Sequence, residues 1–180
     1  MIDQNIMSLD MEYNQPSQSI IQIGIAVGNL QTGVILESAS YYIKVNEQIS
    51  EFIVGLTGIT DQHIEEEGIS LEEAYQHICQ LHTEYKCFRN CLTWGGGDSD
   101  DLRRALRLDN EKYIFGRRWI DAKTCFVSRC FALGLKHQSG LGKSMQRMGL
   151  EFQGRKHDAK YDAINTFLLY RRLLEKFKDE

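Results

Sequence analysis

The order of apolar patterns along the chain predicts an α/β or α+β domain built around one mixed sheet. Strand-like segments come first, and strand-like and helix-like segments alternate after them. With 180 residues, 42% of them hydrophobic, the chain is long enough to bury one sizeable core. It contains one proline and no low-complexity linker or internal repeat, so we expect a single domain over residues 1–180.

Three strand-like segments occupy the beginning of the chain. Ile6 to Tyr13 reads as a strand, and Ser19 to Val27 is a second apolar run. Ala39 to Val45 alternates apolar with polar residues and is predicted as a third strand. We expect these three strands to form an antiparallel meander.

The remainder of the chain is predicted to be mainly helical, with two short strands. Ser70 and Glu73 have the spacing of a capping box, which predicts a helix from Leu71 to about Tyr85. Cys91 to Trp94 is predicted as a strand that ends at three glycines, and Trp119 to Asp121 as the last strand. Further helices are predicted at Asp98 to Leu108, Ala122 to Leu133, Gly140 to Met148 and Asp158 to Lys178.

Charge and composition restrict the classes of function. A net charge of −4 argues against a broad basic surface that grips nucleic acid, but bound divalent cations would reverse the local field at a phosphate site. No segment approaches the roughly 18 apolar residues of a membrane helix, so we expect a soluble, cytoplasmic protein without membrane contacts. The five cysteines are an odd number and lack zinc-knuckle spacing, which favours reduced thiols.

Asp10 and Glu12 are the first candidate site residues. They alternate with Leu9 and Met11 in the first predicted strand, and a strand places residues two apart on the same face. On one interpretation they are surface acids of an edge strand. On the other, the apolar run before them places them half-buried, and paired half-buried anions need a cation.

Asp98 is the second candidate. It follows a predicted strand and three glycines, at the kind of strand end where α/β folds place functional groups. The alternative is that Asp98 is a helix N-cap. Asp100 and Asp101 lie close to it in sequence, so either of them could share its role. The three glycines are not a phosphate-binding P-loop, because no Gly-Lys-Ser/Thr follows them.

His157 and Asp162 lie five residues apart at the start of the last predicted helix. Five helical steps rotate two side chains by about 140°, so both face one site only if His157 sits in the loop or cap before the helix. Gly154 favours such a loop. Asp158 competes for a role, either as the N-cap or as the second acid of an i, i+4 pair with Asp162.

Four acids from three segments and one histidine are the groups that two-metal phosphodiester hydrolysis requires. Carboxylates hold two divalent ions about 4 Å apart, of which one activates water and the other stabilises the leaving oxygen. A neutral histidine can take the proton of that water near neutral pH.

These motifs resemble the DEDDh group of 3′→5′ exonucleases, which includes polymerase proofreading subunits, oligoribonuclease and the histone-mRNA and small-interfering-RNA exonucleases. Leu9 to Glu12 is similar to the first motif, Asp-x-Glu, and Thr93 to Asp98 is similar to the second. His157 to Ala163 is similar to the third motif, His-x-x-x-x-Asp. Two further stretches resemble family sequence, so that the resemblance runs nearly end to end: Gly55 to Thr60, and Gly140 to Lys143 leading to Gly154 and Arg155.

The resemblance implies an RNase H-like α/β fold, a mixed five-stranded sheet flanked by helices. It also implies that Asp10, Glu12, Asp98 and Asp162 bind two divalent metal ions, Mg²⁺ or Mn²⁺. His157 would be the general base.

The resemblance further implies where the terminal nucleotide binds. The Leu56 to Thr60 loop would lie over the terminal base and its sugar, whereas the alternative is that Leu56 and Ile59 only close the core before a helix. Tyr13 stands where relatives often have a small hydroxyl residue or alanine, which implies altered contacts to that nucleotide. The predicted substrate-binding residues are Met11, Tyr13, Leu56, Thr57, Ile59 and Trp94.

The predicted function is metal-dependent removal of nucleotides from the 3′ end of single-stranded RNA or DNA, with release of nucleoside 5′-monophosphates. Trp94-Gly95 most resembles the RNA-directed exonucleases of the group. One alternative is a catalytically silent nucleic-acid-binding module on the same fold. Another is a helical metal phosphohydrolase, suggested by His157-Asp158, which would need further histidine ligands on helices.

Overall fold

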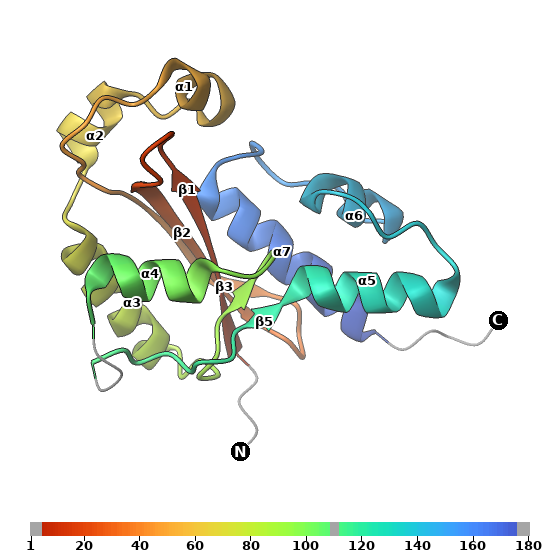
Figure 1. The fold of residues 1–180 in the computed structure, drawn as a ribbon. Coiled ribbons are helices and arrows are strands. Elements are labelled where there is room, and N and C mark those ends of the chain that lie inside the picture. Colours follow the sequence, from red (N-terminus) through yellow and green to blue (C-terminus); the bar gives the residue numbers. More distant parts are fainter. Residues whose placement is uncertain (1–4, 109–111, 176–180) are drawn as a thin grey trace.

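A computed structural model describes residues 5–108 and 112–175 and contains one mixed five-stranded sheet (Figure 1). Its strand order is β3-β2-β1-β4-β5. The first three strands pair antiparallel, β4 pairs parallel with β1, and β5 pairs parallel with β4. The strands are β1 (Asn5–Tyr13), β2 (Ile20–Asn29), β3 (Ile35–Tyr42), β4 (Leu92–Thr93) and β5 (Ile120–Asp121).

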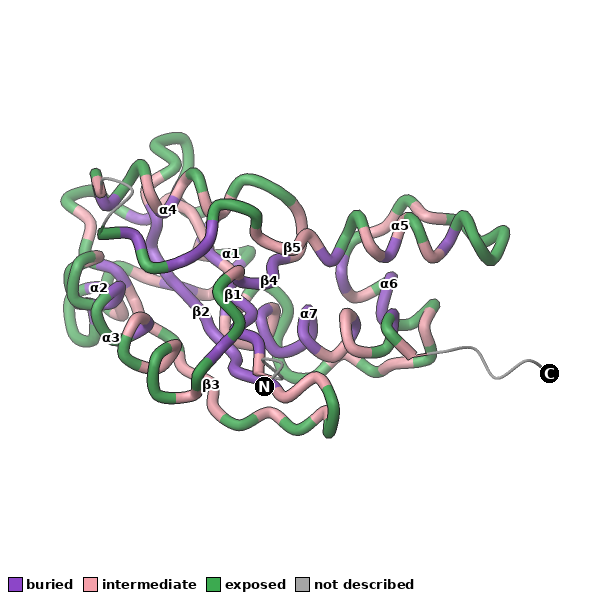
Figure 2. The backbone as a smooth tube through the Cα atoms, turned by 90° about the horizontal axis from the view of Figure 1, so that it is seen from below, coloured by how far each residue is buried: buried purple, intermediate pink, exposed green. Residues whose placement is uncertain are grey.

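Helices cover both faces of this sheet. They are α1 (Glu51–Thr57), α2 (Asp61–Glu67), α3 (Leu71–Glu84), α4 (Asp98–Leu106), α5 (Ala122–Leu133), α6 (Leu141–Arg147) and α7 (Ala159–Leu174). The tube of Figure 2 shows the central strands as the most continuously buried part of the chain. Within the described ranges, no helix is long and apolar enough to cross a membrane.

The alternation of side chains along β1 divides the core into two layers. Met7, Leu9 and Met11 pack in a cluster that contains residues of α3 and α4. The side chain of Ile6 points to the opposite face and packs with Phe167 of α7. Asp10 and Glu12 have the same parity as Ile6, so they lie on the face that α7 covers.

The predicted order of elements is confirmed, and the antiparallel meander of the first three strands is present. The third strand begins earlier than predicted, at Ile35, because its alternation is weak at the half-exposed edge of the sheet. The predicted helix that begins at Asp98 ends at Leu106, since Arg107 adopts a left-handed conformation with φ of 51°. The predicted end of the last helix, Lys178, lies outside the described residues.

Two short helices, α1 and α2, were not predicted. Ser50 caps α1 by accepting a hydrogen bond from the Ile53 amide, and Thr60 forms a capping box with His63 at the start of α2. Gly58, with φ of 76°, ends α1. The predicted loop from Leu56 to Thr60 is therefore wrong in part, because Leu56 and Thr57 are the last residues of a helix.

Candidate active site

The start of α7 approaches the acidic end of β1 closely because β2 has a glycine there. Gly24 is the register partner of Asp10, and a Cβ atom at Gly24 would collide with the backbone of Ala159. Gln22, on the same strand, accepts a hydrogen bond of 3.0 Å from the Ala159 amide. These two contacts fix the first turn of α7, which carries Asp162, beside Asp10.

His157 lies in the turn before α7. Its φ is 60°, and its backbone amide donates a hydrogen bond of 3.2 Å to Oδ2 of Asp162. Asp158 is the N-cap residue of α7 and accepts from the Lys160 amide at 3.1 Å. The condition under which His157 and Asp162 can face one site is thus met, and Asp158 is engaged in capping.

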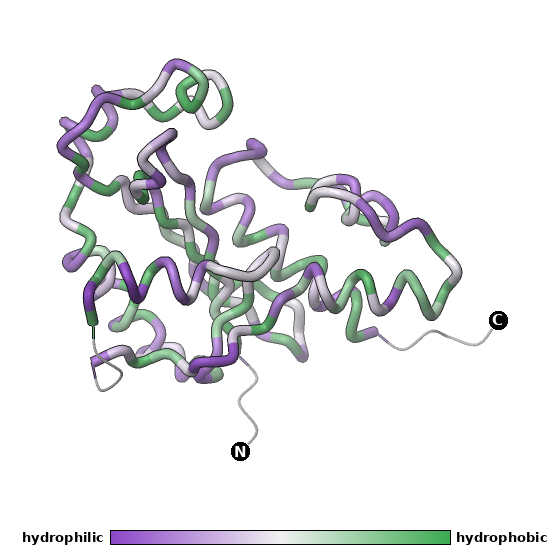
Figure 3. The backbone as a smooth tube through the Cα atoms, in the orientation of Figure 1, coloured by the Kyte–Doolittle hydropathy of each residue, from purple (hydrophilic) through white to green (hydrophobic). Residues whose placement is uncertain are grey.

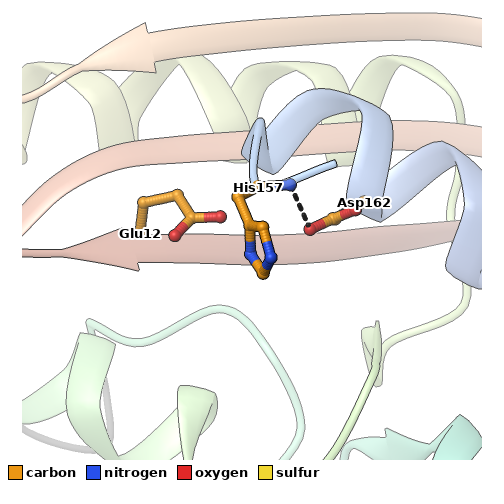
Figure 4. A group of neighbouring side chains, drawn as sticks. All are labelled: Glu12, His157 and Asp162. Carbon is orange, nitrogen blue, oxygen red and sulfur yellow. Dashed lines mark hydrogen bonds between the residues drawn. The ribbon is translucent and has the colours of Figure 1, made fainter. Parts of the chain in front are cut away.

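Three of the predicted site residues converge most closely. Potential ligand atoms of Glu12, His157 and Asp162 all lie within 4.8 Å of one another (Figure 4). Figure 4 shows that the carboxylate of Glu12 comes from the strand, whereas the imidazole of His157 comes from the turn before α7 and the Asp162 carboxylate from the helix itself.

Asp98 begins α4, directly after the glycine turn that follows β4. Gly95 and Gly97 have φ of 108° and 118°, and the Gly95 amide donates to Oδ1 of Asp121 at 3.1 Å. Gly97 is the N-cap residue of α4, so the Asp98 carboxylate is not the helix cap. The charge of Asp98 raises the pKa of Asp10, but neither carboxylate belongs to the group of ligand atoms that lie within 4.8 Å of one another.

Asp100 and Asp101 have other partners. Asp100 forms an ion pair of 2.9 Å with Arg103, and Asp101 forms one of the same length with Arg104. Asp98 is therefore the member of this acidic run that faces Asp10, with Asp101 as its own neighbour.

Burial raises the pKa of all four carboxyl groups, and the charges of neighbouring acids raise it further. Burial is the largest cause for Asp10, and the charges of Asp162, Glu12 and Asp98 add to it, so that its pKa lies well above the ordinary 3.8. Burial and the charge of Asp162 raise the pKa of Glu12 to about 7. Burial first, and then Asp101, raise the pKa of Asp98 to about 7, and burial raises that of Asp162 to about 6.

This donor set fits hard divalent cations. Carboxylate oxygens are the ligands that Mg²⁺ and Mn²⁺ prefer, and a cation would relieve both the burial cost and the repulsion of the clustered anions.

We predict that the metal-free protein loses stability as the pH rises from about 4 to about 7. The carboxyl groups of Glu12, Asp98 and Asp162 have pKa values above their ordinary 3.8 or 4.5, so the folded state binds more protons than the unfolded state in this window. The contribution of these groups to the free energy of unfolding is complete below their ordinary pKa values. It is lost as the pH rises through their pKa values in the folded state. Thermal melting with chelator and with Mg²⁺ should therefore give a difference in Tm that grows with pH. A difference that stays constant across the window would contradict this linkage.

The predicted substrate-binding residues differ in how accessible they are. Leu56 is 37% exposed, whereas Thr57 and Ile59 are buried. The Thr57 hydroxyl donates to the Ile53 carbonyl and accepts from the Ile59 amide. The side chains of Thr57 and Ile59 are therefore part of the protein interior. Met11 is also buried, while Tyr13 and Trp94 are half-buried. The substrate-binding roles of all six residues stay predictions.

Several residues that position the site were missed by sequence reasoning. Gly24 interrupts an isoleucine-rich strand, which is a signal for close backbone approach. Asp121 stands directly before a helix, which is the signal of an N-cap, and it also holds the glycine turn before Asp98. Asn14 ties the end of β1 to the start of α1, through the Gln48 carbonyl and the Ser50 amide.

Comparison with known proteins identifies the family. Residues 3–170 match the family model described as Exonuclease, RNase_T. The chain belongs to this exonuclease family. Mouse 3'-5' exoribonuclease 1 is 28% identical over 166 residues, which are 87% of this chain and 47% of the mouse protein. Human ERI1 exoribonuclease 2 is 26% identical over 179 residues, 85% of this chain and 25% of the human protein. This exonuclease-family chain thus spans about half the length or less of these curated relatives.

Solved structures confirm the predicted RNase H-like α/β fold. The nuclease domain of 3'hExo, described as a DEDDh family member bound to rAMP, has a TM-score of 0.79 at 19% identity, covering 96% of this chain and 92% of that one. Cell-death related nuclease 4 (CRN-4) has a TM-score of 0.81 at 19% identity, covering 96% and 64% of the two chains.

Proposed function

We propose that this exonuclease-family chain hydrolyses phosphodiester bonds at the 3′ end of single-stranded RNA or DNA and releases nucleoside 5′-monophosphates. The observation that carries the proposal is the convergence of Glu12 from β1 and Asp162 from α7 with His157, together with the raised pKa values of Asp10, Glu12, Asp98 and Asp162. We further propose that residues 1–180 act as one exonuclease domain. A catalytically silent binding module would have no need for such clustered, repelling anions.

In the proposed mechanism, Asp10, Glu12, Asp98 and Asp162 would hold two divalent cations. When bound, such ions supply a nucleophilic water at neutral pH and charge stabilisation for the leaving oxygen. The imidazole of His157 accepts the proton of the attacking water, because a neutral imidazole is a base suited to neutral pH. The backbone amide of His157 holds the Asp162 carboxylate in place.

We propose that Tyr13, Trp94 and Leu56 hold the terminal nucleotide, with backbone and packing support from Met11, Thr57 and Ile59. Leu56 supplies exposed apolar surface from α1. The indole of Trp94 is held by the ring of Phe126, with 6.0 Å between the ring centroids. Aromatic and apolar side chains of this kind stack on any base, which suits degradation without strong sequence preference.

We expect shortening from the 3′ end. A 5′-labelled single strand should give a ladder of shortened labelled products, and the released nucleotides should be nucleoside 5′-monophosphates. The Asp10→Ala variant, purified in the same way, controls for contaminating nucleases. Cleavage of a circular single strand would show endonuclease action and contradict the proposal.

We expect a modest preference for RNA or short single strands over duplex DNA. Trp94-Gly95 resembles the RNA-directed exonucleases, and relatives of 26–28% identity are named exoribonucleases. The net charge of −4 and the few basic clusters suit a short footprint better than a long duplex track. Rates on matched RNA and DNA oligomers and on plasmid-length duplex, at equal end concentration, test this. Faster degradation of the duplex would exclude it.

A further inference from the structure

Helix α4 has its charges separated along its axis. Its first turn is acidic and contains Asp98, Asp100 and Asp101, whereas three arginines lie toward its C-terminal end: Arg103, Arg104 and Arg107, here called the arginine face. Figure 3 shows that α4 is largely hydrophilic. Acids near the N-terminus and bases near the C-terminus of a helix stabilise its dipole, so the charge order alone has a simple structural explanation.

The surface beside the arginine face points to a ligand. An open hollow of about 300 Å³ is lined by Tyr13, Asp101 and Arg104, among others, and so begins at Tyr13, the residue that follows Glu12 in β1. A second hollow, of about 520 Å³, is lined by the whole arginine face. Arg104 lines both hollows. The two hollows therefore adjoin at Arg104, and together they extend from Tyr13 along α4.

Arg104 is held in place by a contact that a phosphate can replace. Arg104 pairs with Asp101 at 2.9 Å, and its side chain is 75% exposed. The Tyr13 hydroxyl donates to the same Asp101 carboxylate at 3.4 Å, which links β1 to this pair. Exposed ion pairs stabilise a protein little, because water screens them. The guanidinium fork matches a phosphate as well as it matches a carboxylate, so exchanging one for the other is cheap.

The direction in which the leaving oxygen departs indicates the side of the site on which the rest of the strand lies. In an in-line displacement the leaving oxygen departs opposite the attacking water. His157, the proposed base, lies in a different hollow, with residues of α6 such as Leu141 and Lys143. In Figures 1 and 2, α7 lies between α6 and α4. A strand that leaves on the side opposite His157 would therefore run toward α4.

We propose that the arginine face is a track for the phosphate backbone on the 5′ side of the scissile bond. This inference rests on the proposed function and deepens it: the substrate is a polynucleotide strand that contacts α4 as well as the terminal-nucleotide site. The track recognises phosphates and reads no base sequence.

The test compares a strand with a substrate too small to reach α4. A single-stranded RNA oligomer spans the track, whereas the p-nitrophenyl ester of thymidine 5′-monophosphate has no upstream phosphate. The ratio of kcat/KM for the oligomer to kcat/KM for the ester should fall by about tenfold in the Arg104→Ala/Arg107→Ala double variant. The slope of log KM against log salt should fall by about 0.7 for each phosphate contact removed.

A matched control removes two arginines elsewhere. Arg117 and Arg118 are exposed and precede β5, so the Arg117→Ala/Arg118→Ala variant should keep the wild-type ratio and salt slope. The Arg104→Lys/Arg107→Lys variant keeps the positive charges but lacks the planar guanidinium groups. Its ratio of kcat/KM values should therefore fall less than that of the alanine variant. If the double alanine variant had the wild-type ratio of kcat/KM values and the wild-type salt slope, the proposal would be overturned. The arginine face would then only stabilise the helix.

Binding without turnover separates this inference from the proposed function. Fluorescence anisotropy of a 5′-labelled strand in Ca²⁺ should show a higher Kd for the double alanine variant than for the wild type. If the wild type hydrolysed neither substrate, the proposed function would be wrong. The anisotropy comparison would still show whether the arginine face binds the strand. Equal Kd values for the wild type and the double alanine variant would exclude binding of the strand by the arginine face.

Discussion

Replacing Asp10 or Asp162 with alanine is expected to lower turnover by at least about a hundredfold, the size of effect seen when one charge-stabilising group is removed from an active site. Asp10 has the other three acids as neighbours, so its loss would weaken the binding of both proposed cations. The fold should remain, because burial disfavours both charged carboxylates and the charge of Asp162 repels that of Asp10. Removing one anion relieves that repulsion, so the metal-free variants should melt at the same temperature as the wild type or higher.

Two measurements make this result specific. Metal affinity, followed by calorimetry, should fall together with turnover, whereas Glu72→Ala, which removes an exposed acid of α3, should change neither. Wild-type turnover should also cease with chelator and return with Mg²⁺ or Mn²⁺. If the Asp10→Ala and Asp162→Ala variants kept full activity in chelator, the reaction would not depend on these carboxylates or on metal.

The local sequence was sufficient for those parts of the fold that have a regular period. The alternation in β1 and the capping box before α3 define elements within a single segment, and the structure has both close to their predicted bounds. The helices α1 and α2 have seven residues each, which is too short for an apolar period to show, so they were missed despite the caps at Ser50 and Thr60.

The candidate site could be proposed from the sequence as a set of residues, but its geometry could not. The pair Asp10 and Glu12 follows from the two-residue period of a strand, and the turn at His157 follows from its spacing to Asp162. The approach of α7 to β2 depends on Gly24, whose role becomes visible only when the register places it opposite Asp10. Such long-range contacts have no period along the chain.

Asp98 shows how tertiary structure can choose among adjacent candidates. In sequence, Asp98, Asp100 and Asp101 are three acids in one helical turn, and any of them could serve. The hydrogen bond from the Gly95 amide to Asp121 holds the turn before α4, and Gly97 occupies the N-cap position. Asp98 then faces Asp10, while the other two acids face arginines of their own helix. The glycines, Asp121 and the three acids can all be read from the sequence. The orientation of the first turn of α4, which determines where each acid points, cannot.

His157→Ala is expected to lose about a hundredfold or more in turnover, which is the contribution typical of a general base, while metal affinity stays nearly normal.

The proximity of His157 to Glu12 and Asp162 would also allow a second role, as a metal ligand. Hard, oxygen-preferring ions gain little from an imidazole when carboxylates are at hand, and His157 is exposed in the turn before α7, where it can reach the attacking water. Calorimetry with Mg²⁺ or Mn²⁺, in the presence of a single-stranded oligomer, separates the two roles. The control is His137→Ala, which removes an imidazole that contacts Phe131 away from the acidic cluster. If His157→Ala lost metal affinity in step with activity, His157 would be a ligand, and the proton of the water would have to pass to another group.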